Sequence, residues 1–303
     1  MNNAMSEPDA RPKLSDPTNC GEDHVYNLSR VTAIAKVHCG DCENYHITTP
    51  VFRLTGRCAW NEGARTVLTG FVQSFLAGRT PSGDPIEIVI AGAADTSILA
   101  SCAHAANFAT NGNLEDVRFT VLDKCGTPLE LCRDFAQLHG LKVDAFAADL
   151  TRLVRAYPAD VIVLHSVLAF IPQSCHAALL RECGRWLKPG GRIFLWNSIT
   201  PEHGPRAKHS RIEVSNRMRA MIKAEAVTIN EPIAQFIGRL DHLIEVPRGI
   251  HRIASTAAVH HLLAEVGLPV ISAETFNLVR TVPDQPSMIR PHMLAVLGPP
   301  NAN

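Results

Sequence analysis

The stretch IEIVIAGAADTS (residues 86–97), followed by RFTVLDKC (residues 118–125), decides the fold of this chain. The first piece is an apolar run that ends in a turn of small residues, and the second is an apolar run that ends in an acid, Asp123. A strand, a small-residue turn, a helix and a second strand with a terminal acid form a nucleotide-type βαβ unit. In such a unit the ligand lies on the turn and its ribose meets the acid. We therefore expect the functional site at this turn.

Strand and helix patterns alternate from residue 86 onward. Continuous apolar runs such as VIVL (161–164) and IFLW (193–196) favour strands that are covered on both faces, as in a parallel sheet. The last two expected strands have no helix between them, which indicates a hairpin. The expected strands are 86–91, 118–123, 142–147, 160–165, 191–197, 270–278 and 292–297, and the expected helices are 96–108, 127–139, 149–156, 174–187 and 255–267.

The residues outside this alternating pattern are expected to form a tail, an N-terminal helical part and an insertion. Residues 1–22 are polar and predict a flexible tail, and residues 23–83 have helical periodicity that ends in the turn-forming cluster TPSGDP (80–85). We expect 23–83 to form a helical lid or appendage on a main α/β domain at 84–303. A helical insertion at 200–254 would follow the fifth strand and lie above the carboxyl ends of the strands, where open α/β sheets bind ligands.

Composition limits the partners of the protein. Lysine plus arginine equal aspartate plus glutamate, 29 against 29, so the chain lacks the basic excess of a general nucleic-acid or acidic-membrane binder. The N-terminus has no apolar signal-peptide core. Nine cysteines scattered through apparent strands and helices suggest reduced thiols. We therefore expect a cytoplasmic location.

Five motifs, in their order and placement, resemble the class I S-adenosylmethionine-dependent methyltransferase family over residues 84–298. The most specific motif is LLRECGRWLKPGGRIFL (179–195), a helix that runs through LKPGG into a strand. The resemblance implies a seven-stranded, mostly parallel sheet with helices on both faces. The other motifs are IVIAGAADT (88–96), VLDKC (121–125), AADLT (147–151) and ADVIVLHSVLAF (159–170).

The resemblance implies S-adenosylmethionine as the cofactor and places its contacts residue by residue. Asp123 stands at the ribose-binding acid and Asp149 at the position that contacts the adenine amine. The turn departs from the family pattern, because only Gly92 of its glycines is kept and Ile90 replaces the usual acid. Asp95 could partly replace that acid, and Thr96 or Ser97 could cap the next helix. The expected cofactor-binding residues are Gly92, Ala93, Ala94, Asp95, Asp123, Lys124, Asp149, Leu150 and His165.

His165 is the leading catalytic candidate, because it ends the fourth strand and histidine accepts protons near neutral pH. The alternative is a strand-end histidine that hydrogen-bonds backbone or shapes the pocket. An N-terminal helix folds over the cofactor as a lid in related methyltransferases, so Tyr45, His46 and Arg53 could bind the cofactor carboxylate or the substrate. Trp196 and Arg248 could contact the substrate as well.

The segment HCGDCENYH (38–46) also has the spacing of a metal site. Cys39, Cys42 and His46, with either His38 or Cys58, could furnish a tetrahedral zinc set. The second half of a usual zinc pattern is absent, so we predict no metal here.

The most consistent function is methyl transfer to an N, O or S atom of a small molecule. The alternatives are a macromolecular methyltransferase acting on RNA or protein, and a non-catalytic binding or assembly subunit that keeps the fold. The neutral charge counts against RNA. The basic stretch RIEVSNRMRAMIKA (211–224) suits either a solvated helix face or a homodimer interface.

Overall fold

The computed structural model describes residues 28–39, 42, 45–46, 59–79, 83–152, 155–199, 220, 232, 234–238, 253–280 and 288–300. The helices are α1 (Leu28–His38), α3 (Ala59–Ala77), α4 (Ser97–Ala109), α5 (Gly126–His139), the 3-10 helix η3 (Val167–Phe170), α6 (Gln173–Trp186) and α9 (Thr256–Val266). The strands are β1 (Ile86–Ala91), β2 (Val117–Asp123), β3 (Lys142–Ala147), β4 (Ala159–His165), β5 (Leu187–Ser198), β6 (Val270–Arg280) and β7 (Met288–Leu297).

The strands form one seven-stranded sheet in the order β3-β2-β1-β4-β5-β7-β6. Neighbouring strands from β3 to β5 are parallel, whereas β7 pairs antiparallel with both β5 and β6. The predicted α/β fold class and the pairing of the last two strands are therefore confirmed. Because β1 to β5 are parallel, their carboxyl ends lie at one edge of the sheet, and that is the edge at which the sequence predicts the site.

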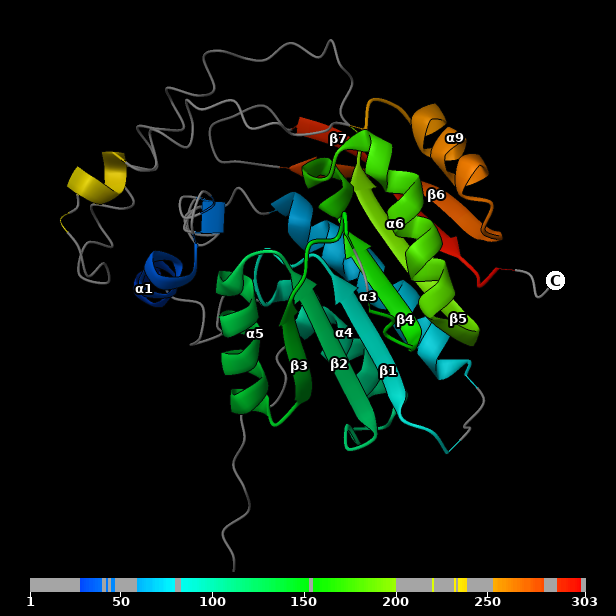
Figure 1. Cartoon of the computed structure of the whole chain (residues 1–303), viewed down its shortest axis with the longest axis horizontal. Helices are drawn as coiled ribbons and strands as arrows, with labels where there is room; N and C mark the ends of the chain where they lie inside the picture. The colour runs from blue at the N-terminus through cyan, green and yellow to red at the C-terminus, as the bar shows by residue number, and fades with distance from the viewer. Residues whose placement is uncertain are drawn as a thin grey trace, which may run out of the picture.

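Helices cover both faces of the sheet, with α6 and α9 in front and α3 and α4 behind in the view of Figure 1. The alternation of side chains along each strand divides the core in two. Ile88 and Ile90 of β1 pack with α3, α4 and α5, whereas Val89 and Ala91 pack with α6 and α9. This division explains the unbroken apolar runs in the sequence, because both faces of the central strands are buried.

The prediction of a helix at 149–156 is wrong. Its described residues, 149–152 and 155–156, form turns and bends that lead into β4. Asp149 accepts hydrogen bonds from the backbone N–H and the hydroxyl of Thr151, at 2.9 and 2.7 Å. An aspartate that bonds two residues ahead stabilises a turn in competition with a helix.

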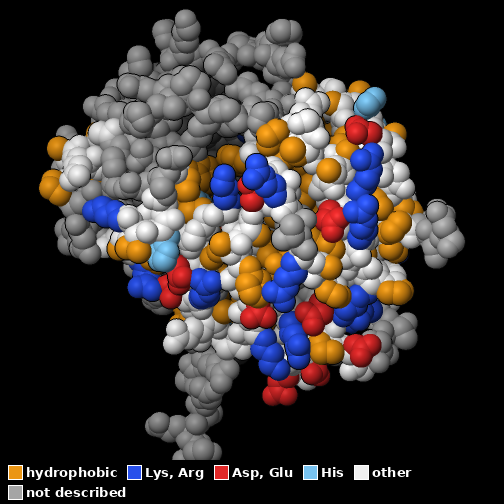
Figure 2. Space-filling view, in the orientation of Figure 1, with side chains coloured by type: hydrophobic (Ala, Val, Ile, Leu, Met, Phe, Trp, Pro, Cys, Tyr) orange, Lys and Arg blue, Asp and Glu red, His pale blue; other side chains and the backbone are white. Residues whose placement is uncertain are grey.

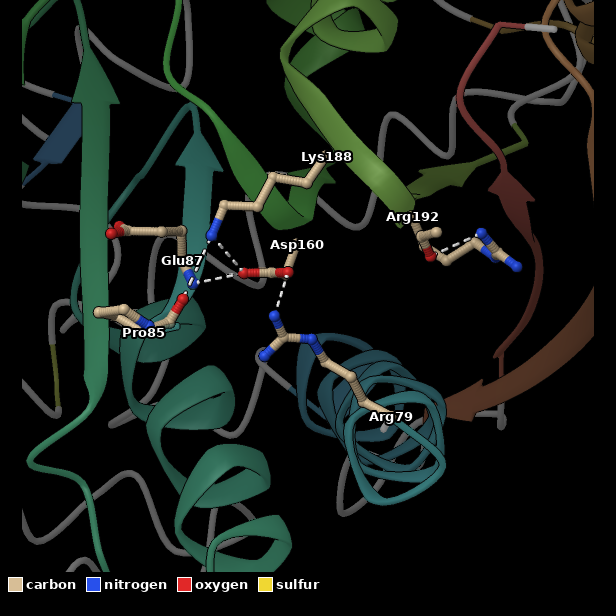
Figure 3. Close-up of polar contacts among 7 residues, drawn as sticks. Arg79, Pro85, Glu87, Asp160, Lys188 and Arg192 are labelled. Carbon is tan, nitrogen blue, oxygen red and sulfur yellow. Dashed lines mark hydrogen bonds and ion pairs between the residues drawn. The ribbon is translucent and has the colours of Figure 1, made fainter. Parts of the chain in front are cut away.

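The LKPGG motif anchors the opposite, amino-terminal edge of the sheet. Asp160 at the start of β4 is only 4% exposed and forms ion pairs with Arg79 at 2.7 Å and with Lys188 at 3.0 Å. Asp160 also accepts the backbone N–H of Glu87 at 2.8 Å. Figure 3 shows how these groups converge from β1, β4, β5 and the segment that directly follows α3. Lys188 is thus a structural residue of this Asp160 network, far from the expected site.

Charges elsewhere on the described surface are mixed. Figure 2 shows lysine and arginine side chains interspersed with aspartate and glutamate on one face. Among the described helices none is both long and apolar enough to span a bilayer.

Candidate functional site

The turn after β1 is built around Gly92. Its φ is +87°, a conformation that residues with a side chain rarely adopt. A Cβ added at Gly92 would lie 2.4 Å from Cγ2 of Val167 in η3. The turn keeps this glycine, therefore, both for its backbone conformation and for the close approach of η3.

Asp123 joins this turn to the end of β2. One carboxylate oxygen accepts the N–H of Ala93 at 2.9 Å and the other accepts the N–H of Cys125 at 2.7 Å. Burial raises the pKa of the Asp123 carboxyl, and these two hydrogen bonds oppose that change. A carboxylate has about four acceptor positions, so two bonds leave capacity for ribose hydroxyls. Asp123 therefore fits the predicted ribose contact.

Asp95 has a local structural role. It is 5% exposed, and its Oδ1 accepts the backbone N–H of Ser97 at 2.7 Å as well as the Ser97 hydroxyl. Thr96 makes no side-chain capping bond to α4. The expected cap from Thr96 or Ser97 is thus wrong, because the carboxylate of Asp95 takes that place at the positive end of the helix.

The carboxyl end of β3 brings Asp149 and Leu150 to the same edge. The hydroxyl of Thr151 holds the pKa of Asp149 below its usual range. Leu150 is 8% exposed, and its Cδ1 would lie 3.6 Å from a Cβ at Gly92, which places it against the turn. Lys124, by contrast, is exposed. The structure thus assembles the expected residues of three strands along one edge.

His165 ends β4 and has a buried Nε2 with no hydrogen-bond partner among the described residues. Its ring is nearly parallel to that of Trp196, with centroids 6.4 Å apart. Burial lowers the pKa of His165 to about 4, with further contributions from Arg65 and His292. His165 is consequently neutral at pH 7.

Trp196 lies in the core rather than at an open surface. Its side chain is fully buried, its Nε1 donates to Nδ1 of His292 at 3.1 Å, and its ring stacks on Phe276. The expected substrate contact at Trp196 does not match this placement. A strand-end tryptophan could not be assigned from the sequence, because whether it faces solvent depends on β6 and β7, far along the chain.

Because His165 is neutral in the folded protein, we expect the stability of the fold to fall in acid. The unfolded side chain takes up a proton near pH 6.5, but the folded one does so only near pH 4, so stability is lost as the pH falls from 6.5 toward 4. Between pH 7 and pH 5 this loss amounts to about 2 kcal/mol. Urea unfolding of His165→Asn should show a pH dependence weaker by that amount, whereas the exposed His260→Gln should match the wild type. Equal pH dependence in all three proteins would contradict the assignment.

The structure places Tyr45 and His46 against the turn, as a lid would be. His46 is 3% exposed, and its Nδ1 bonds to the carbonyl oxygen of Ala94 at 3.1 Å. The Tyr45 ring packs edge-on against Phe170 of η3, with centroids 5.4 Å apart. Arg53 and Arg248, together with nearly all of the insertion at 200–254, lie outside the described residues.

Cys125 is the residue that the sequence reasoning missed. Its thiol, with those of Cys39 and Cys42 and the imidazole of His46, forms a group whose ligand atoms all lie within 4.8 Å of one another. Cys125 is separated from the CxxC segment by more than 80 residues, so no local spacing could reveal it. Hydrogen bonds from Cys39 and Cys42 lower the pKa of the Cys125 thiol.

Part of the chain matches a known family model. A family model described as a methyltransferase domain matches residues 100–191. No curated protein matches the sequence. The chain is similar to the solved apo structure of the S-adenosylmethionine-dependent methyltransferase SibL, at 18% identity and a TM-score of 0.44, covering 78% of this chain and 57% of SibL.

Two further solved structures show a comparable degree of similarity. The mitomycin 7-O-methyltransferase MmcR is 17% identical, with a TM-score of 0.42 and coverage of 77% of this chain and 54% of MmcR. The N-methyltransferase NodS from Bradyrhizobium japonicum is 14% identical, with a TM-score of 0.45 and coverage of 79% and 98%. The chain thus spans little more than half the length of SibL and MmcR.

The fold assignment depends on the sheet and on the family match. The order β3-β2-β1-β4-β5 is that of a doubly wound sheet, and an antiparallel β7 inserted before β6 completes the arrangement that the motifs implied. The family match covers α4 through the start of β5, including Asp123, Asp149 and His165. The chain accordingly has a class I methyltransferase-like α/β fold, and its residues 100–191 match a methyltransferase domain.

Proposed function

We propose that this protein transfers a methyl group from S-adenosylmethionine to an N, O or S atom of a small molecule. The observation that supports this most is the convergence of the Gly92 turn, Asp123, Asp149 and His165 at one edge of the sheet. Asp123 would hold the ribose, Asp149 and Leu150 the adenine, and the turn backbone the methionine portion. The bound cofactor supplies an electrophilic methyl group.

A small acceptor is favoured by what covers this edge. Tyr45 packs on Phe170 of η3 and His46 bonds to Ala94 in the turn, so the chain itself covers part of the edge, which suits a compact acceptor better than a flat macromolecular surface. Mixed surface charges give no support to an RNA partner. We take the protein to act in the cytoplasm, since described cysteines are all free thiols.

His165 would contact the methyl acceptor. Its unpartnered Nε2 keeps a lone pair at neutral pH and so suits a group that accepts a hydrogen bond from the methyl acceptor. With a pKa of about 4 it would take the proton only once the arriving methyl group has made that proton acidic. Stacking on the buried Trp196 would fix the orientation of the ring. The role of Trp196 in this proposal is therefore to position His165.

Binding of the cofactor is the first test. Titration calorimetry of the full chain with S-adenosylmethionine and with S-adenosylhomocysteine should show one site per chain for each ligand. Absence of binding by either ligand at millimolar concentration would refute the proposed reaction. Binding without turnover on a broad panel of small N, O and S acceptors would instead favour a non-catalytic binding subunit.

The role of His165 predicts a selective loss of turnover. His165→Ala should lower kcat by roughly 100-fold while the affinity for S-adenosylmethionine changes little, because general-base groups act on the acceptor. Release of S-adenosylhomocysteine with the best acceptor of the panel measures this effect. The exposed His260→Ala is the matched control. A kcat for His165→Ala within threefold of the wild type would exclude a direct role.

A further inference from the structure

Four metal-type ligands from two distant parts of the chain, residues 39–46 and Cys125, meet beside the turn after β1. Cys39 directly follows α1, Cys42 completes the CxxC, and His46 comes from the next helical piece. Cys125 is the N-cap residue of α5, two residues after Asp123. One ligand atom from each of the four lies within 4.8 Å of the others, and Cys39, His46 and Cys125 are buried.

No disulfide joins these sulfurs, and their positions suit a shared cation. Sγ of Cys125 is 3.2 Å from Sγ of Cys39 and 3.1 Å from Sγ of Cys42. A disulfide requires about 2.05 Å, whereas sulfurs bound to one tetrahedral zinc at about 2.3 Å are separated by about 3.8 Å. Three thiols also cannot all pair with one another. A small outward shift of each sulfur would admit one ion at the centre of the group.

Groups around the four ligands are arranged as supports for a metal site. The hydrogen bond of His46 Nδ1 with the carbonyl oxygen of Ala94, at 3.1 Å, requires the proton on Nδ1 and so leaves the Nε2 lone pair for a metal. The hydroxyl of Thr127 lies 2.6 Å from Sγ of Cys39, where it can donate to a thiolate. Both ligands are therefore oriented by partners outside the group.

The backbone is packed to bring the ligands together. A Cβ added at Gly126 would lie 3.1 Å from the side chain of His38, so the end of α1 lies directly on the turn after β2. Val31 of α1 packs on Leu131 of α5, and Arg30 forms an ion pair with Asp134. Figure 1 shows α1 beside the upper end of α5. The Cys39 and Cys125 sulfurs are thus held close by contacts that do not involve the metal.

The donor set selects the kind of ion. Three thiolates and one imidazole are the ligands of tetrahedral Zn²⁺, and oxygen-seeking Mg²⁺ or Ca²⁺ would not choose them. The mutual distances of at most 4.8 Å fit a single ion, because an iron–sulfur cluster spreads its cysteines over several irons. All four positions are filled by the protein, as in a structural site.

We propose that Cys39, Cys42, His46 and Cys125 bind one Zn²⁺, which fixes the segment after α1 onto the turns after β1 and β2. The ion holds His46 against Ala94 and thereby keeps the neighbouring Tyr45 on Phe170 above the cofactor edge. The site is structural, and it stands independently of the proposed reaction. It replaces the prediction, made from the incomplete CxxC pattern, that this segment binds no metal.

Metal analysis of the full chain tests this assignment. After dialysis the wild type should hold about one zinc per chain, and Cys125→Ser and His46→Gln should each lower the zinc content about tenfold or more. Cys175→Ser, which changes a partly exposed cysteine outside the group, should keep the zinc. A folded wild type without zinc, a bound iron cluster with visible absorption, or a Cys39–Cys125 or Cys42–Cys125 disulfide in mass spectrometry would overturn the proposal.

A second measurement does not depend on how well the variants fold. Replacement of zinc by Co²⁺ in the wild type should produce the intense visible bands of tetrahedral cobalt bound to thiolates, and their absence would refute the ligand set. Removal of the metal by a chelator should speed amide hydrogen exchange in α1, because the ion fixes the chain that follows it. Unchanged exchange in α1 in a zinc-depleted protein would overturn the fixing role.

Discussion

Asp123→Asn should weaken the binding of S-adenosylmethionine roughly 10- to 100-fold, because a hydrogen bond to a charged group contributes about 1.5–3 kcal/mol. The substitution keeps the size of the side chain but removes the charge that would bind the ribose hydroxyls. It also turns one acceptor oxygen into a donor that faces the N–H of either Ala93 or Cys125. Titration calorimetry with S-adenosylmethionine measures the effect.

The matched control for Asp123→Asn is Asp144→Asn. Asp144 is an exposed aspartate in β3, away from the carboxyl edge, so its loss should leave affinity unchanged. Asp123 also holds the backbone at Ala93 and Cys125, so its substitution could disturb the local structure as well as ribose binding. Zinc content separates these two effects, because a structural disturbance around Cys125 would also release the metal. Asp123→Asn protein with wild-type affinity would show that the ribose assignment is wrong.

Asp160→Ala should lower the free energy of unfolding by about 2–4 kcal/mol, because removing one member of a buried ion pair leaves its partners without compensation. Arg79, Lys188 and the N–H of Glu87 all lose the Asp160 carboxylate at once, although Lys188 keeps a hydrogen bond to the carbonyl oxygen of Pro85 at 3.2 Å. Arg79 and Lys188 keep some solvent contact, which limits the loss of unfolding free energy. Urea unfolding at pH 7 measures this change.

The control for Asp160→Ala is Glu130→Ala. Glu130 pairs with Arg133 on the outer surface of α5, and exposed pairs contribute at most about 1 kcal/mol. A loss below 1 kcal/mol for Asp160→Ala would mean that the packing of α3 and β5 holds this edge without the ion pairs. Cofactor affinity should be unchanged in a folded Asp160→Ala protein, because the network lies at the opposite edge of the sheet.

The fold could be predicted because its signals are local. Apolar runs such as VIVL at 161–164 have the length and the continuity of strands buried on both faces, and turn residues separate them. The expected helix at 149–156 failed for a local reason as well. Asp149 bonds the backbone and the hydroxyl of Thr151, and the apolar spacing did not reveal this competing turn.

The amino-acid sequence by itself determined the order of the strands and four of the five helices expected after residue 86, together with the turn at Gly92, the acid that ends β2 and the acid that follows β3. These features depend on residues close together in the chain, where periodicity and turn chemistry act. Only the tertiary structure decided that Trp196 is buried, that Asp95 caps α4 and that Cys125 joins Cys39, Cys42 and His46. Burial and ligand geometry are set by atoms from distant segments, so no local pattern could have specified them.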